Sequence, residues 1–241
     1  MRPVWGAATD TGRLRERNED SYLAEGRIFA VADGMGGHAA GDVASGMVID
    51  ALRPLAAAEV LSIRELTQVI RTVNDAIVAC GFERAPTIGM GTTVTGVALV
   101  SRDDTPLWAV FNVGDSRVYR FVDGRLTQVT VDHSEVQELM DAGHLTPEEA
   151  RTDPRRHIVT RALGAVPAPP VDLWILPPEP GERFLVCSDG LTEELTDAQI
   201  EKILATTATP AEAADALVDE ALRAGGHDNV TVVVVTAQDR T

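Results

Sequence analysis

The chain has 241 residues, of which 44% are hydrophobic, and its formal net charge is −16. These values predict an ordinary globular protein, and because no linker divides the chain we expect a single domain over residues 1–241. The acidic charge argues against nucleic acid as a partner, two cysteines give no disulfide framework, and the lack of a long apolar stretch predicts a cytoplasmic protein without a membrane segment.

Strands are predicted by short apolar runs at residues 3–8, 21–33, 92–101, 107–122, 125–130, 183–188 and 230–236. Asp123 and Gly124 separate two of these runs and predict a hairpin. Helices are predicted at 41–57 and after the capping signals that begin at Ser62, Thr146, Thr196 and Thr209. Helices and strands do not alternate regularly, which argues against a parallel Rossmann sheet. The order favours antiparallel sheets covered by helices, in an α+β protein.

Residues 133–165, which we call the flap, differ from their surroundings. A short helix is predicted to begin near Ser134, but Gly143, Pro147 and Pro154 then interrupt any regular element, and no strand is predicted. An irregular segment of this length inside a compact domain is typical of a flap beside a functional site.

Four aspartates lie at the ends of apolar runs. Asp33, Asp115 and Asp189 each follow such a run, and Asp228 comes just before one. If the four meet, their repulsion must be offset, and hard divalent cations with oxygen ligands do this. The pattern therefore predicts a carboxylate metal centre at strand ends. Gly34 can add its carbonyl to such a cation, although Asp-Gly also fits a tight turn between a strand and a helix.

A group of mixed charges precedes the first of these aspartates. Arg13, Arg15 and Arg17 lie close to Glu19 and Asp20. One interpretation is a solvated cluster of ion pairs. The other is an arginine fork that binds a phosphate, with the two acids hydrogen-bonding waters around the metal ions.

Taken together, these motifs resemble those of the bacterial metal-dependent protein phosphatases (PPM family, type 2C). The matching segments, in chain order, are Arg15-x-x-Asn18-Glu19-Asp20, Asp33-Gly34-Met35-Gly36-Gly37-His38, Gly91-Thr92-Thr93, Gly114-Asp115-Ser116-Arg117, Ser188-Asp189-Gly190-Leu191 and Asp228-Asn229-Val230-Thr231. The resemblance extends from about residue 7 to about residue 236. It implies an α-β-β-α sandwich of two antiparallel sheets flanked by helices, with a flap subdomain. It also implies two or three Mn²⁺ or Mg²⁺ ions and hydrolysis of phosphoserine and phosphothreonine in proteins.

The resemblance implies a role for each matching metal position. Asp33 corresponds to the acid that bridges the two main ions, and Gly34 to the residue that offers its backbone carbonyl to one of them. Asp189 and Asp228 correspond to the remaining protein ligands of that pair. Asp115 corresponds to a ligand of a third ion, which Asp189 would share.

Other positions of the resemblance concern the phosphate and the leaving group. Arg15 corresponds to the phosphate-binding arginine, with Arg17 as the nearest competitor. His38 corresponds to the general acid, and its alternative interpretation is a loop histidine bonded to backbone. Residues expected around the metal ligands are Glu19, Asp20 and Asn229.

The expected reaction is attack on phosphorus by a hydroxide shared between two ions, without a covalent phosphoenzyme. The expected partners are phosphorylated proteins, a serine/threonine kinase among them. A phosphohydrolase acting on small phosphoesters would use the same centre. A pseudophosphatase that only binds phosphoproteins would be expected to lose a metal aspartate, and none is lost here. The spread of the acids along the chain argues against a calcium-binding structural loop.

Overall fold

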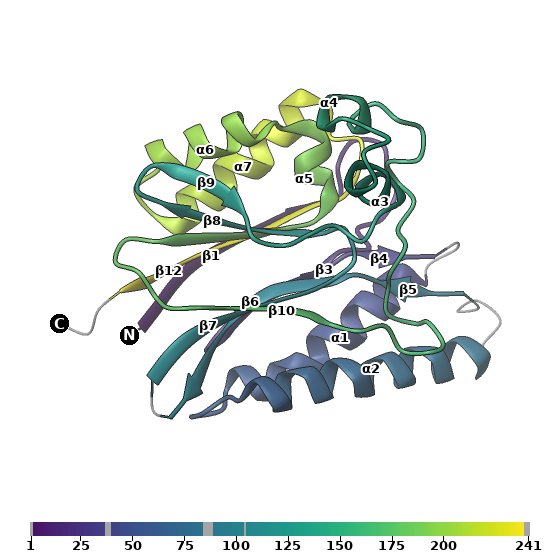
Figure 1. Ribbon diagram of the computed structural model, residues 1–241, viewed down its shortest axis with the longest axis horizontal. Coiled ribbons are helices and arrows are strands. Elements are labelled where there is room, and N and C mark those ends of the chain that lie inside the picture. Colours follow the sequence, from purple (N-terminus) through teal and green to yellow (C-terminus); the bar gives the residue numbers. More distant parts are fainter. Residues whose placement is uncertain (1, 37–39, 84–88, 104, 239–241) are drawn as a thin grey trace.

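Two antiparallel sheets lie face to face, and helices cover the outer face of each (Figure 1). The structure is a computed structural model that describes residues 2–36, 40–83, 89–103 and 105–238. Helices α1 (Gly41–Ala56) and α2 (Ile63–Glu83) cover one sheet, and α6 (Asp197–Thr206) and α7 (Pro210–Ala224) cover the other. The predicted α-β-β-α sandwich is confirmed.

Each large sheet has five strands. The first has the order β1 (Arg2–Asp10), β12 (Val230–Gln238), β11 (Arg183–Cys187), β8 (Arg117–Val122) and β9 (Arg125–Gln128). The second has the order β10 (Asp172–Leu176), β7 (Thr105–Val113), β6 (Val94–Arg102), β3 (Ile28–Ala32) and β2 (Ser21–Glu25). A separate pair joins β4 (Gly34–Met35) to β5 (Gly91–Thr92). The first and last strands of the chain, β1 and β12, are therefore neighbours in one sheet.

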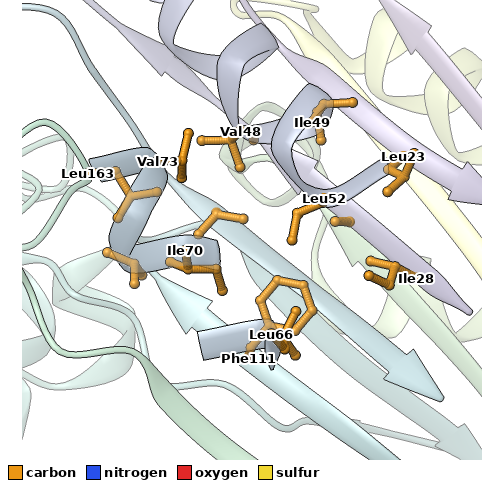
Figure 2. Close-up of a cluster of buried hydrophobic side chains, with 14 of the residues drawn as sticks. Leu23, Ile28, Val48, Ile49, Leu52, Leu66, Ile70, Val73, Phe111 and Leu163 are labelled. Carbon is orange, nitrogen blue, oxygen red and sulfur yellow. The ribbon is translucent and has the colours of Figure 1, made fainter. Parts of the chain in front are cut away.

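Alternating side chains along the strands produce separate buried layers. In β12, Val233 and Val235 pack between the two sheets, whereas Val232 and Val234 pack beneath the helices. This follows from the two-residue period of a strand buried on both faces. On the other side of the molecule, the helix-covered layer gathers aliphatic residues of α1 and α2 over the second sheet (Figure 2).

Aromatic rings fill the space between the sheets. The Trp108 ring lies 5.4 Å from that of Phe184 in the opposite sheet and 6.5 Å from that of Phe29 in its own sheet. Its indole Nε1 donates a 2.8 Å hydrogen bond to the buried carboxylate of Glu182. This bond satisfies the one polar atom of the ring, so the indole can be fully buried.

Two predicted strands are each divided in the structure. The run 21–33 forms the hairpin of β2 and β3, which turns at Gly26 with φ of +57°. The run 107–122 forms β7 and β8, which belong to different sheets. The chain crosses between the sheets at Gly114, whose φ is +120°, a backbone conformation that favours glycine. Polar residues and a glycine break both runs, at 25–27 and 114–117, but the flanking apolar residues led each run to be predicted as one strand.

The predicted helices are present, and two elements longer than two residues were missed. Capping boxes begin α4 (Pro147–Ala150), α6 and α7, as predicted, and Ser134 caps α3 (Glu135–Asp141). The missed elements are β10 and the short helix α5 (Asp189–Glu194). β10 is a short apolar run, DLWIL, at the edge of its sheet, and it was overlooked in the sequence.

The flap forms a closed loop around α3 and α4. Its two ends pair through Ser134 and Val159, and Leu163 pairs with Thr92 of β5. Among the described residues, no helix combines the length and the hydrophobicity that a membrane span requires.

Candidate metal centre

The four strand-end aspartates meet at one end of the sandwich. Asp33 follows β3 and Asp115 follows β7, both in the second sheet, whereas Asp189 follows β11 and Asp228 precedes β12 in the first sheet. All four line a cavity of about 860 Å³. It lies at the end of the sandwich where the flap helices α3 and α4 are found (Figure 1). Each sheet thus contributes two carboxylates to one cavity.

The electrostatics of this cavity are unfavourable without a cation. Burial, followed by repulsion from Asp20, Asp189, Asp115 and Asp228, raises the pKa of Asp33 well above its usual range. Burial and the charge of Asp189 likewise raise the pKa of Asp115. The buried Oδ1 of Asp189 has no hydrogen-bond partner among the described residues. A set of oxygen donors with one unsatisfied member fits hard divalent cations such as Mn²⁺ and Mg²⁺.

Gly34 lies where two segments of backbone leave no room for a side chain. A Cβ at this position would be 2.2 Å from the carbonyl oxygen of Gly41 and 2.6 Å from that of Glu19. Gly34 also lines the cavity and pairs with Thr92 across the short β4–β5 sheet. It therefore belongs both to a tight connection between β3 and α1 and to the wall of the site.

Two threonines and a serine join the Asp33 and Asp115 loops. Thr93 Oγ1 accepts a 2.9 Å hydrogen bond from the Asp33 backbone N–H and lies 2.8 Å from Ser116 Oγ. Thr92 Oγ1 donates to the Asp33 carbonyl at 2.8 Å. The matching motifs contain these residues, but the sequence offered no reason to give them a role.

The Asp115 loop is also held by the start of the flap. The backbone N–H of Gly114 donates to His133 Nδ1 at 3.0 Å, and its carbonyl accepts from the His133 N–H at 3.0 Å. Burial lowers the pKa of His133. In the neutral ring Nδ1 is the acceptor, so Nε2 carries the proton and donates to Asp172 at 3.1 Å. His133 is therefore a buried residue that holds the Asp115 loop in place.

Asp20 lies beneath the cavity. Its Oδ2 accepts a 2.8 Å hydrogen bond from Ser188, and its buried Oδ1 has no partner among the described residues. Burial raises the pKa of Asp20 to about 7 despite its hydrogen bonds. Glu19 lines the cavity, and burial together with the charge of Asp42 raises its pKa.

Asn229 fixes the loop that carries the arginines. Its side-chain Oδ1 accepts from the Glu19 N–H, and its Nδ2 donates to the carbonyls of Thr11 and Arg17, each at 2.8 Å. Residues more than 200 positions apart in the chain are therefore joined beside Asp228.

The three arginines of this loop have different environments. Arg15 lines the cavity and its Nη2 lies 2.5 Å from Oδ2 of Asp228, while its side chain remains 57% exposed. Arg13 donates instead to the backbone carbonyl of Leu222. Arg17 is not among the residues that line the cavity. The geometry therefore distinguishes Arg15 from its competitor.

Three other histidines are candidates for the site or line the cavity. His38, the candidate general acid, lies outside the described residues. His157 and His227 line the cavity and pair with Glu193 and Glu194 at 2.7 Å and 2.6 Å. His157 belongs to the basic flap triplet 155–157, so the clue to its position was present in the sequence, but its distance from Asp33 along the chain concealed the contact.

Comparison with known proteins agrees with this geometry. The family model described as Protein phosphatase 2C matches residues 14–224. The chain is 43% identical, over 98% of its length, to the serine/threonine protein phosphatase PstP of Mycobacterium tuberculosis, and it spans 45% of that relative's length. It is 39% identical to the serine/threonine phosphatase stp of Listeria innocua, covering 94% of this chain and 93% of that protein.

A solved structure gives the same result in three dimensions. The catalytic domain of PstP in complex with two manganese ions superimposes with a TM-score of 0.88 at 40% identity, covering 98% of this chain and 99% of that one. Sequence, fold and the arrangement of the strand-end carboxylates lead to one conclusion: the chain belongs to the protein phosphatase 2C family.

Proposed function

We propose that this protein is a metal-dependent phosphatase that hydrolyses phosphoserine and phosphothreonine in other proteins. One observation carries the proposal: four carboxylates from two sheets line one open cavity, beside an arginine that is largely exposed. The named relatives are serine/threonine phosphatases, and the PstP catalytic domain binds two manganese ions. We assign the cofactor as two ions, or three, of Mn²⁺ or Mg²⁺.

In this proposal Asp33, the backbone carbonyl of Gly34, Asp189 and Asp228 hold the main pair of ions. Asp115 and Asp189 hold a third. When bound, the ions supply an activated water as the nucleophile and neutralise charge on the phosphoryl oxygens. The protein contributes rigid placement, because each carboxylate is anchored at a strand end and the Asp33 and Asp115 loops are hydrogen-bonded to one another.

Arg15 binds the phosphoryl group in this proposal. Its guanidinium offers a planar fork that matches phosphate oxygens, and the group already faces the cavity from beside Asp228. Glu19 and Asp20 accept hydrogen bonds from waters around the ions. Asn229 keeps Arg15 in place through its bonds to Thr11 and Glu19, on either side of Arg15 in the loop.

His38 protonates the departing serine or threonine oxygen. An aryl phosphate has a good leaving group and needs this proton less than phosphothreonine does. Comparing the two substrates with a His38→Ala variant therefore tests the role, and equal losses on both would remove it.

The function itself is tested by phosphate release from a phosphothreonine peptide. Release is expected with Mn²⁺, and EDTA is expected to abolish it until Mn²⁺ is restored in excess. Undiminished release in EDTA would contradict the metal-dependent mechanism. Parallel assays on nucleotides and sugar phosphates separate a protein phosphatase from a phosphohydrolase of small esters. The partners we propose are phosphorylated cytoplasmic proteins, including a serine/threonine kinase.

Replacing Arg15 by alanine is expected to raise KM for the phosphothreonine peptide by about tenfold or more, because a charge-assisted pair with the substrate phosphate is lost. Arg17→Ala is the matched control, since it removes the same side chain from the same loop. Its KM should stay close to that of the wild type. If Arg17→Ala produces the larger rise, the assignment of the two arginines is reversed.

A further inference from the structure

Two flap arginines lie on the wall between the main cavity and a smaller neighbour. The second cavity has a volume of about 290 Å³ and lies against the flap helices. Arg151 and Arg156 line both cavities, as do Asp115, Asp189 and Glu193. A peptide whose phosphorylated residue enters the main cavity thus brings a neighbouring side chain to these arginines.

Both of these guanidinium groups are available. Among the described residues, neither Arg151 nor Arg156 has a side-chain hydrogen bond or an ion pair, and both residues are exposed. The adjacent Arg155 differs, because its guanidinium makes two 2.8 Å hydrogen bonds to Asp153. Among the described arginines of the flap, the two that line both cavities thus differ from Arg155, which is held by Asp153.

The acids around the smaller cavity are already accounted for. Asp132, Asp197 and Glu193 bind a guanidinium, a phenol and an imidazole, respectively. Asp115 and Asp189 are the proposed ligands of the cations. Burial raises the pKa of Glu193, whereas the nearby charge of Arg156 lowers it. Once the cations are bound, Arg151 and Arg156 together leave a positive charge on this wall that Glu193 alone does not offset.

This positive wall contrasts with the rest of the molecule. A chain of net charge −16 repels an anionic peptide at long range. The positive side chains of Arg151 and Arg156 attract an anionic group of the peptide that lies close to them. Charges of this kind determine specificity more than affinity.

We propose that Arg151 and Arg156 form a second anion subsite, which selects substrates that carry a negative group close to the phosphorylated residue. The group is a carboxylate side chain or a second phosphate. The proposal rests on the proposed function and adds a substrate preference to it. Two guanidinium groups on one cavity wall suit a phosphate best, since a dianion with three oxygens can accept from both.

The test uses one phosphothreonine peptide in a series of versions. Each version places glutamine, glutamate or a non-hydrolysable phosphonate analogue of phosphoserine at one position on either side of the phosphothreonine. The measured quantity is kcat/KM with Mn²⁺, expressed as a ratio to the glutamine peptide. The wild-type ratio is expected to reach about ten at the best position, with the phosphonate at or above glutamate. Higher NaCl should reduce the ratio.

In the double variant Arg151→Gln, Arg156→Gln the ratio is expected to fall to about one. Arg155→Gln, the matched control, should keep the wild-type ratio. Fluorescence anisotropy with a peptide that carries phosphonates at both positions measures binding without turnover, and the double variant should bind about tenfold more weakly. Circular dichroism and the melting temperature check that the flap variants are folded.

The outcomes separate the two proposals. Hydrolysis with the same ratio in the wild type and the double variant would overturn the subsite and leave the phosphatase function intact. Failure to hydrolyse any of the peptides would overturn both. A preference for the phosphonate alone assigns the subsite to a second phosphate, and an equal preference assigns it to either anion.

Discussion

Replacing Asp189 by asparagine is expected to lower kcat/KM for a phosphothreonine peptide by about 10³-fold, since the electrostatic contribution of a bound cation is worth several kcal/mol. Asp189 has the largest expected effect because it is the carboxylate proposed to contact both the main pair of ions and the third. Its Oδ1 is buried without a partner among the described residues, so an amide there keeps the shape and loses the charge. The loss should not be repaired by a moderate excess of Mn²⁺.

Asp50→Asn is the matched control, because it makes the same change on the exposed face of α1. Its kcat/KM should equal that of the wild type. Circular dichroism and thermal unfolding of the Asp189 variant check that the sandwich remains folded. Wild-type turnover in a folded Asp189→Asn protein would contradict the proposed metal centre.

Mn²⁺ is expected to raise the melting temperature by about 5–10 °C at a concentration near 100 times its dissociation constant. The binding free energy available for stabilisation under that condition is about 2.7 kcal/mol, and a domain of this size gains a few degrees per kcal/mol. The physical reason is that the cations remove the repulsion among the buried aspartates. EDTA should reverse the gain, which differential scanning calorimetry measures directly.

The same repulsion gives this stability a defined pH dependence. The pKa of Asp33 is raised in the folded protein, so the metal-free folded state binds protons more tightly than the unfolded state does. Without metal, the contribution of Asp33 to the free energy of unfolding is therefore fully present below its unfolded pKa and is lost as pH rises toward the raised folded one. Protons and cations compete for the carboxylates, so the gain from Mn²⁺ should be smaller at pH 5.5 than at pH 7.5.

Asp33→Asn separates this effect from other titrating groups. In EDTA at pH 7.5 the variant should melt several degrees above the wild type, because a repelled buried charge has been removed. With Mn²⁺ it should gain little. If the variant melts below the wild type in EDTA, repulsion among the buried aspartates does not destabilise the metal-free protein.

The sequence predicted the layers of the fold better than its connections. Capping boxes and apolar runs are local signals, and the structure contains the helices and most of the strands they indicated. The division of 107–122 between two sheets is not local, because the break at 114–117 does not specify which sheet each half of the run joins. The edge strand β10 is stabilised by pairing with β7, and nothing within its five residues specifies that partner.

The candidate site shows the same division. Aspartates at strand ends were visible because apolar runs mark the strands, and the structure gathers all four in one cavity. The distinction between Arg15 and Arg17 depends on Asn229, more than 200 residues away, and could not be derived from the spacing of the arginines. The flap residues of the cavity wall were concealed for the same reason, since the path of an irregular segment is set by tertiary contacts.

Because the carboxylates come from both sheets, the affinity for the ions depends on how the two sheets are aligned. Under the proposed assignment, any sliding of one sheet over the other changes the distances between Asp33 and Asp189, and with them the affinity for the ions. The aromatic packing of Trp108 against Phe184 opposes that sliding from the interior of the sandwich. Residues that never approach an ion can therefore influence metal affinity, and the bound ions would in turn link the two sheets.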